Sequence, residues 1–178
     1  AEAIQALTEG RGADHVFDFS LGNPEIEPPD ALLDVVQRLA EERKPGTHAY
    51  MPNAGFPPVR EAIAGRLASE CDLPFEGKHI IMTVGAGGAL NTLLKAMLDP
   101  GDEVICLPPY FVEYGFYISN HGGKMVLVDT DEKFLPVPER IAAAVTPRTK
   151  AIIVNSPNNP TGVLYDESVY RGLDEMLK

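Results

Sequence analysis

The sequence predicts an α/β protein built around a mostly parallel sheet. From about Lys78 onward, short runs of apolar and β-branched residues alternate with segments of helical periodicity. The runs expected to form strands are His79–Val84, Glu103–Leu107, Met125–Val128 and Ala151–Val154. Continuous apolar runs of this length are typical of parallel strands, because helices cover both faces of such a sheet.

The segments between these runs predict the helices that connect parallel strands. They are Ala86–Leu98, Phe111–Asn120 and Val137–Val145. Crossovers of this length between parallel strands form right-handed βαβ units. The alternation therefore indicates helices packed on a central sheet.

The chain before Lys78 has a different organisation. Apolar residues at helical spacing predict a helix over Asp30–Glu42, which Pro45-Gly46 ends. A further helix is expected over Val59–Ser69, and Ala1–Ala13 is expected to form a short helix followed by a Gly-containing linker.

The last segment, Asp166–Lys178, also has the pattern of a helix. A parallel sheet that ended with Ala151–Val154 would expose an apolar edge and face. We therefore expect these residues to be the front part of a larger protein.

The composition is that of a globular protein with an acidic surface. Of 178 residues, 44% are hydrophobic and 23% are charged, and the formal net charge is -11. An acidic surface repels the phosphates of nucleic acids and anionic membranes, so neither is an expected partner. The apolar runs are far shorter than a membrane span.

The cysteine and histidine content indicates neither a disulfide framework nor a metal site. Cys71 and Cys106 are the only cysteines, and the four histidines are dispersed. Scattered thiols and no visible leader favour a reducing compartment, and we expect a cytoplasmic protein.

The segment Asn155–Gly162 predicts a stiff loop after the run Ala151–Val154. Its two prolines and one glycine favour a sharp turn. The loop lies beyond the carboxyl end of a strand, where open α/β sheets bind their ligands. The amides of Asn155, Asn158 and Asn159 can orient a polar ligand but are not nucleophiles. An ordinary strand-to-helix turn would have the same composition.

Small residues follow the run His79–Val84 where a helix is expected to begin. Gly85–Ala89 contains three Gly and two Ala. A ligand can approach the free N–H groups of such a first turn, and the helix dipole favours an anion there. The segment lacks the third Gly of the dinucleotide fingerprint and the Gly-Lys-Ser/Thr of the P-loop. It fits either a phosphate cradle or a tight turn.

Aromatic residues follow the run Glu103–Leu107. Pro108 and Pro109 fix a turn, and Tyr110 and Phe111 come directly after it. An aromatic ring at the carboxyl end of a strand can stack on a planar ligand. The alternative is a helix start that packs into the core.

Taken in order, these motifs resemble the class I/II aminotransferases, enzymes of the aspartate aminotransferase fold that use pyridoxal 5′-phosphate (PLP). In chain order the motifs are Leu21-Gly22-Asn23-Pro24, Tyr50 followed by Gly55-Phe56-Pro57, Gly85–Ala89, Pro109-Tyr110-Phe111 and Asn158-Asn159-Pro160-Thr161-Gly162. The resemblance runs from about Asp14 to Lys178. It implies a three-layer α/β/α large domain, incomplete here, preceded by an N-terminal arm and part of a small α+β domain. The expected division is residues 1–45 for the arm and small-domain segment and 46–178 for the PLP-binding large domain.

The resemblance also implies roles for cofactor-binding residues. Gly85, Ala86 and Gly87 match the turn whose backbone N–H groups hold the cofactor phosphate. Phe111 matches the aromatic residue that stacks on the pyridine ring. Asn159 matches the residue that hydrogen-bonds the 3′-oxygen of that ring.

Substrate and partner contacts follow from the same resemblance. Gly22 matches the N-terminal segment that closes over the substrate carboxylate, and Asn159 is expected to face the substrate as well. Tyr50 matches a tyrosine that reaches the phosphate in the partner subunit, so a homodimer is implied. In the family, Pro109 and Pro160 often follow cis peptide bonds.

The sequence departs from the family at the cradle. Ala86 and Gly87 stand where many relatives carry Ser or Thr, so one or two hydroxyl contacts to phosphate are missing.

The residues that do the chemistry in the family are not found in this sequence. The Schiff-base Lys, the Asp for the pyridine nitrogen and the Arg residues for the phosphate and the substrate carboxylate belong to a part of the family beyond the matched one. Lys95 and Lys133 each follow a Thr by three residues, but neither has the Gly-rich, Arg-bearing sequence that should come next. No catalytic residue is assigned.

These features predict a PLP-dependent aminotransferase that acts on an amino acid and a 2-oxo acid, with this sequence as its N-terminal part. One alternative is another PLP enzyme of the same fold type, such as a C–S lyase or a decarboxylase-like enzyme. The other is a non-catalytic domain that binds a phosphate ligand or a protein partner.

Overall fold

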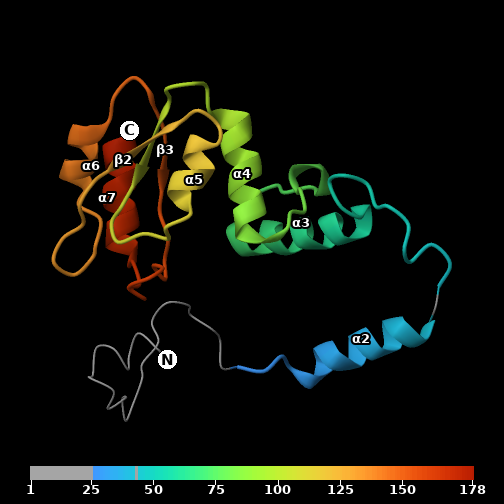
Figure 1. The fold of residues 1–178 in the computed structure, drawn as a ribbon. Helices are drawn as coiled ribbons and strands as arrows, with labels where there is room; N and C mark the ends of the chain where they lie inside the picture. Colours follow the sequence, from blue (N-terminus) through green and yellow to red (C-terminus); the bar gives the residue numbers. More distant parts are fainter. Residues whose placement is uncertain (1–25, 43) are drawn as a thin grey trace, which may run out of the picture. The chain divides into compact units, whose positions relative to one another are not determined.

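The computed structural model describes residues 26–42 and 44–178 (Figure 1). They fall into two units, one ending at Tyr50 and one running from Met51 to Lys178, and each is described by itself. The short helix and linker expected within Ala1–Ala13 and the predicted substrate-binding residue Gly22 lie outside the described residues.

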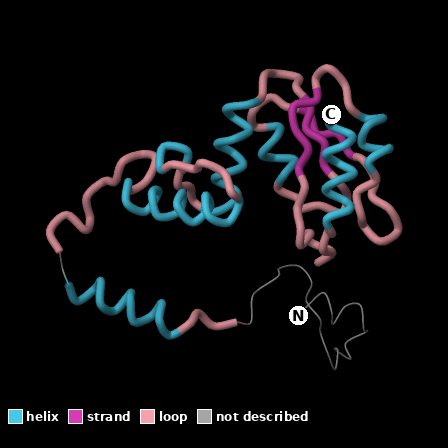
Figure 2. Tube along the Cα trace, turned by 180° about the vertical axis from the view of Figure 1, so that it is seen from behind, coloured by secondary structure: helices cyan, strands magenta, loops and turns pink. Residues whose placement is uncertain are grey.

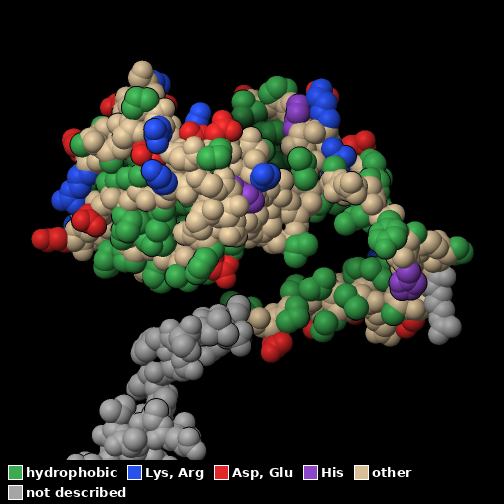
Figure 3. Space-filling view, turned by 45° about the horizontal axis from the view of Figure 1, so that its top comes forward, with side chains coloured by type: hydrophobic (Ala, Val, Ile, Leu, Met, Phe, Trp, Pro, Cys, Tyr) green, Lys and Arg blue, Asp and Glu red, His purple; other side chains and the backbone are tan. Residues whose placement is uncertain are grey.

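In the first unit, helix α2 (Asp30–Glu42) has the bounds that the sequence predicts. Leu32, Leu33 and Leu39 recur at helical spacing, and each is more than half exposed. Figure 3 shows hydrophobic side chains along this part of the surface. A helix in a protein gains most of its stability by burying such a face, and α2 alone leaves it in contact with solvent.

The second unit begins with helix α3 (Pro57–Cys71) and the short 3-10 helix η1 (Gly77–His79). Helix α3 starts on two prolines, whose missing N–H groups are not needed in a first turn. Arg60 on α3 donates from Nε to the carbonyl of Ile80 at 2.7 Å. This bond ties α3 to the segment that leads toward the sheet.

The strand predicted over His79–Val84 does not form. His79 closes η1, and residues 80–84 are extended without a neighbouring strand among the described residues. The N–H of Met82 donates to the carbonyl of Ala54 at 3.0 Å, and Ile80 accepts from Arg60. An apolar run marks an extended segment but not its hydrogen-bond partners, and here a loop and a helix supply them.

The three other predicted strands are confirmed and form one parallel sheet. They are β1 (Glu103–Cys106), β2 (Lys124–Leu127) and β3 (Thr149–Ile153). The strand order is β2-β1-β3, with Ile105 opposite Val126 on one side and Ile152 on the other. The central strand β1 is the most buried, with Val104, Ile105 and Cys106 fully inaccessible to solvent.

Helices cover both faces of the sheet, as Figures 1 and 2 show, so the unit has the predicted three layers. On one face lie α4 (Gly85–Met97) and α5 (Tyr114–Ser119), and on the other α6 (Pro138–Ala144) and α7 (Glu167–Leu177).

Two hydrophobic cores follow from the alternation of side chains along β1. Val104 and Cys106 join a cluster with Leu94 and Ile118 of the α4–α5 layer. Ile105 packs with Ile141 and Leu173 of the α6–α7 layer. Burying an aliphatic side chain of this size stabilises the fold by roughly 1.5–3 kcal/mol. The cores hold the loops at the carboxyl ends of β1 and β3 in place.

Candidate cofactor-binding site

Four of the predicted cofactor-binding residues line one cavity of about 250 Å³. The cavity is lined by Ala86, Gly87, Leu90, Phe111, Tyr114, Tyr117, Asn155, Pro157 and Asn159. These residues come from the start of α4, the segment after β1 and the loop after β3. The topology thus brings three separate motifs to the carboxyl-end side of the sheet, where ligands of open α/β folds bind.

The first turn of α4 presents backbone donors to this cavity. The first internal bond of the helix runs from the N–H of Gly88 to the carbonyl of Val84 at 3.2 Å. The N–H groups of Gly85, Ala86 and Gly87 come before it, and no side chain of the N-cap residue Val84 caps them. Free N–H groups at the positive end of a helix dipole are suited to bind an anion.

Glycine is required at position 85 for its backbone conformation. Gly85 has φ +66, in the left-handed region that L side chains rarely adopt. Gly85 is not among the residues that line the cavity, but it is followed at once by two that are, Ala86 and Gly87.

The aromatic part of the site is built around Tyr114. Phe111 meets Tyr114 edge-on, with ring centroids 5.7 Å apart and planes at 76°. Tyr110 stacks on the same ring at 6.4 Å. The carbonyl of Pro108, which precedes a cis peptide bond to Pro109, accepts a 2.7 Å hydrogen bond from the Thr130 hydroxyl. The half-buried Phe111 therefore has a fixed support from which to contact a planar ligand.

The loop after β3 is folded by its own amides. Asn158 is 7% exposed, and its side-chain oxygen accepts from the hydroxyl of Thr161 at 2.8 Å and from the Thr161 N–H at 3.2 Å. The side chain of Asn155 accepts from the N–H of Asn159 at 2.8 Å. Asn158 thus shapes the loop, and the Asn159 side chain is left to face the cavity.

The peptide bonds before Pro109 and Pro160 are cis, as the resemblance predicts. The bond between Ser156 and Pro157 is also cis, which the sequence did not predict.

Tyr50 was expected to contact the phosphate of a partner subunit. Tyr50 belongs to the first unit and is fully exposed. Gly22 lies outside the described residues. Lys95 is in the last turn of α4, and Lys133 lies in a loop. No lysine is among the described residues that line the cavity.

Sequence reasoning missed Tyr114 and Tyr117 as lining residues, whereas Asn155 was named among the amides that can orient a ligand. Phe111, Tyr114 and Tyr117 are spaced by three, which would place them on one face of a helix that starts at Phe111. That spacing was the available signal for Tyr117. Helix α5 itself begins only at Tyr114, later than predicted, after a turn at Val112 and Glu113.

The cysteines offer no nucleophile to the site. Cys71 and Cys106 are both free, and neither lines the cavity. Burial raises the pKa of the Cys106 thiol to about 12, so it stays protonated.

Among the described residues, His, Cys, Asp and Glu form no group of three or more that could hold a metal ion. In the same part of the chain, no helix is long and apolar enough to cross a membrane.

The donor set fits a phosphorylated, planar ligand. The first turn of α4 offers N–H groups to a phosphate, Phe111 offers an aromatic face, and Asn159 offers a neutral amide to a ring substituent. A phosphorylated pyridine such as PLP has all three features.

Known proteins similar to this chain belong to a family whose cofactor has these three features. The family described as "Aminotransferase class I and II" matches residues 14–177. The chain is 45% identical over 168 residues to a probable aspartate/prephenate aminotransferase of Thermus aquaticus, which covers 93% of this chain and 43% of that protein.

Solved structures lead to the same family. An aspartate aminotransferase from Thermus thermophilus with maleate superposes with a TM-score of 0.79 at 42% identity, over 88% of this chain and 41% of that one. An amino transferase from Eubacterium rectale reaches a TM-score of 0.87 at 31% identity, over 99% and 44%. The chain thus spans well under half the length of these relatives. Enzymes of this family are PLP-dependent.

A match over nearly every residue, a shared fold, and a cavity whose donors suit the family's cofactor lead to one assignment. This chain belongs to the class I and II aminotransferase family.

Proposed function

We propose that the native-length protein is a PLP-dependent aminotransferase, which transfers an amino group between an amino acid and a 2-oxo acid. The observation that carries this proposal is the one cavity that unites the first turn of α4, the Phe111 ring and the Asn159 amide. The activity is assigned to the native-length protein because the chain spans only 43% of a relative such as that of Thermus aquaticus.

Each residue of the site has a proposed role. The N–H groups of Gly85, Ala86 and Gly87 hold the cofactor phosphate, and their position ahead of the first helical bond of α4 supports this. Phe111 fixes the plane of the pyridine ring. Asn159 donates to the 3′-oxygen of that ring.

When bound, PLP supplies an electron sink for a carbanion at the substrate's α-carbon. The residues of this chain bind and orient the cofactor. The lysine that the family uses is proposed to lie outside these 178 residues, since no lysine lines the cavity in the described part of the chain.

Aspartate is the proposed amino donor. The Thermus aquaticus relative is named for aspartate and prephenate, and the Thermus thermophilus structure contains maleate, a small dicarboxylate. Gly22 and Asn159 are the residues of this chain proposed to contact the substrate.

A homodimer is proposed for the assembled enzyme. Tyr50 would reach the phosphate bound in the partner subunit, and its full exposure leaves it accessible for that contact. Residues 1–45 would form the arm and small-domain segment, and 46–178 the first part of the large domain. Two free cysteines agree with a cytoplasmic location.

The test uses the purified native-length protein with PLP, aspartate and a 2-oxo acid. Formation of a new amino acid in step with the loss of aspartate supports the proposal. Release of carbon dioxide, or of sulfide from a cysteine substrate, would instead favour the decarboxylase-like or C–S lyase alternative. Binding of PLP without turnover of any amino acid would favour the non-catalytic domain.

A further inference from the structure

The hydroxyl of Tyr117 on α5 lies against the first turn of α4. A Cβ atom built on Gly87 would stand 2.7 Å from the Tyr117 Oη and 3.4 Å from its Cζ. The first distance is too short for any real side chain, whereas the second is an ordinary contact. Gly87 does not have a positive φ. A side chain at position 87 would therefore force the Tyr117 hydroxyl to move, whereas the backbone at Gly87 does not itself demand glycine.

The cradle residues that follow Gly85 provide no hydroxyl of their own, since Ala86 and Gly87 have no polar side-chain atom. The hydroxyls among the cavity-lining residues belong to Tyr114 and Tyr117. Tyr114 is buried in the core cluster below α4 and α5. The Tyr117 hydroxyl is the one that fills the space beside Gly87 in the first turn of α4.

The Tyr117 hydroxyl is protonated and held in place by Glu113. It donates a hydrogen bond to the Glu113 carboxylate, one turn earlier on the chain. This bond raises the pKa of Tyr117, so the phenol remains a donor at neutral pH. Glu113 is exposed, so water can solvate its carboxylate if the hydroxyl turns to another acceptor.

We propose that the Tyr117 hydroxyl is a side-chain donor to the cofactor phosphate, in the place that a hydroxyl on residue 87 would otherwise occupy. The inference rests on the proposed PLP-dependent function. A phosphate bound to the N–H groups of Gly85, Ala86 and Gly87 lies beside the space next to Gly87 that the Tyr117 Oη fills. Tyr117 is thus a ligand of the phosphate and takes no part in the chemistry at the substrate.

The test compares PLP with pyridoxal, which has the same ring without the phosphate. The dissociation constants of both are measured by titration of the native-length protein, its Tyr117→Phe variant and a Tyr170→Phe control. Tyr170 is on α7, is 46% exposed and does not line the cavity. We expect Tyr117→Phe to weaken PLP binding about tenfold, because one hydrogen bond to a charged group is lost, and to leave pyridoxal binding within about twofold.

A reciprocal pair of variants separates a lost hydroxyl from a damaged fold. Gly87→Ser clashes with the Tyr117 Oη and is expected to weaken PLP binding. In Gly87→Ser combined with Tyr117→Phe the new Cβ meets only the ring Cζ at 3.4 Å, and the serine returns a hydroxyl to the same place. We expect this double variant to bind PLP within about threefold of the wild type, more tightly than either single variant. If Tyr117→Phe alone does not fold, the PLP affinities of Gly87→Ser and of the double variant still test whether the two hydroxyls can replace each other.

Several outcomes would overturn the inference. Equal PLP binding by the wild type and Tyr117→Phe would show that the hydroxyl does not touch the phosphate. Equal losses for PLP and pyridoxal would show that Tyr117 acts on the ring. If the double variant bound PLP no more tightly than Gly87→Ser, a serine hydroxyl at position 87 would not replace the Tyr117 hydroxyl as a phosphate donor. In all three cases the wild type still binds PLP, whereas a wild type that does not bind PLP removes the proposed function and this inference together.

Discussion

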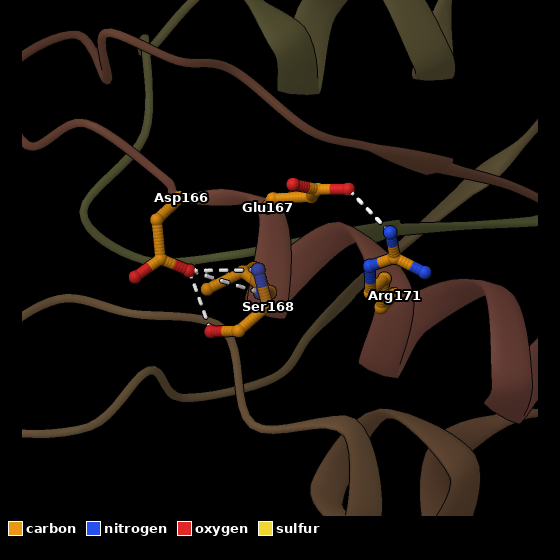
Figure 4. A network of polar contacts seen from close by, with 5 residues as sticks. Asp166, Glu167, Ser168 and Arg171 are labelled. Carbon is orange, nitrogen blue, oxygen red and sulfur yellow. Dashed lines mark hydrogen bonds and ion pairs between the residues drawn. The ribbon is translucent and has the colours of Figure 1, made fainter.

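Helices α4 and α7 differ in what accepts hydrogen bonds from the N–H groups of their first turns. At the start of α7, the Asp166 carboxylate accepts from the N–H of Ser168 at 2.9 Å and of Val169 at 3.3 Å (Figure 4). The Ser168 hydroxyl donates to the same oxygen at 2.5 Å. At the start of α4, the N-cap residue is Val84, whose side chain accepts nothing.

The difference shows what a helix N-terminus can be used for. Every helix leaves about four N–H groups without an internal partner, and a side-chain oxygen of Ser, Thr, Asp or Asn at the N-cap commonly accepts from one or two of them. Helix α7 has such a cap, and a second acid, Glu167, forms an ion pair with Arg171 on the next turn at 2.5 Å (Figure 4). Helix α4 has small residues and no acid, so its donors stay open to an anion. We therefore propose that the self-capped start of α7 is structural and that the uncapped start of α4, which lines the cavity, binds the ligand.

The largest expected effect comes from giving α4 the cap that α7 has. In Val84→Asp the new carboxylate would accept from the first-turn N–H groups and repel the phosphate. We expect PLP affinity to fall about 100-fold, since two charge-assisted hydrogen bonds are lost. The same change should raise the melting temperature by about 2–4 °C, because the helix gains a cap. Titration with PLP and thermal unfolding of the native-length protein measure the two effects.

Controls at position 84 separate competition from charge. Val84→Ala leaves the N–H groups open and should bind PLP within about twofold of the wild type. Val84→Asn offers a neutral cap and should lie between the alanine and aspartate variants. Undiminished PLP binding by Val84→Asp would show that the first turn of α4 does not hold the phosphate.

A smaller effect is expected at the ring end of the site. Asn159→Ala removes the amide proposed to donate to the 3′-oxygen, and we expect PLP binding to weaken about tenfold. Pyridoxal has the same oxygen, so its binding should weaken equally. Variants at the α4 end should instead affect PLP alone. Asn120→Ala, an exposed asparagine after α5, is the matched control. If pyridoxal binding stayed unchanged in Asn159→Ala, the assignment of Asn159 to the ring would be wrong.

Much of the fold could be predicted from the sequence, because local sequence patterns determine most of its strands and helices. The strands around Val104, Met125 and Ile152 are read from continuous apolar runs. The helices follow from periodicity, with ends within a few residues of those observed. The run His79–Val84 was misread because a strand depends on a neighbour, and no local pattern records which group accepts from Met82.

The sequence also pointed to residues that the structure brings together, although their roles stay predictions. Ala86, Gly87, Phe111 and Asn159 line one cavity because each follows a recognisable turn and the parallel topology gathers such turns at one side of the sheet. Tyr117 was missed because it lies on α5 whereas Gly87 lies on α4, and a glycine in a sequence does not show which residue fills the space beside it. Asn158 resembles Asn159 in sequence, and only burial separates the loop-building amide from the one that faces the cavity.

The smallest expected effect is the removal of the cap from α7. Asp166→Ala leaves the N–H groups of Ser168 and Val169 without their acceptor, and we expect the melting temperature to fall by about 2–4 °C. PLP binding should not change, because Asp166 does not line the cavity. A loss of PLP affinity in Asp166→Ala would contradict the proposal that the start of α7 is structural and only the start of α4 binds the ligand.

The pH dependence of this variant identifies the charge as the cause. Hydrogen bonds from the Ser168 side chain and from the N–H groups of Val169 and Ser168 lower the pKa of Asp166 below its ordinary value of 3.8. A carboxyl group whose pKa is lowered by folding stabilises the protein above its unfolded pKa, and this contribution is lost as the pH falls through the folded pKa. The difference in stability between the wild type and Asp166→Ala should thus be constant from about pH 5 to 7 and shrink below 3.8. Asp166→Asn keeps a neutral cap, so its stability relative to Asp166→Ala should stay level across the same range, and chemical unfolding at each pH measures both differences.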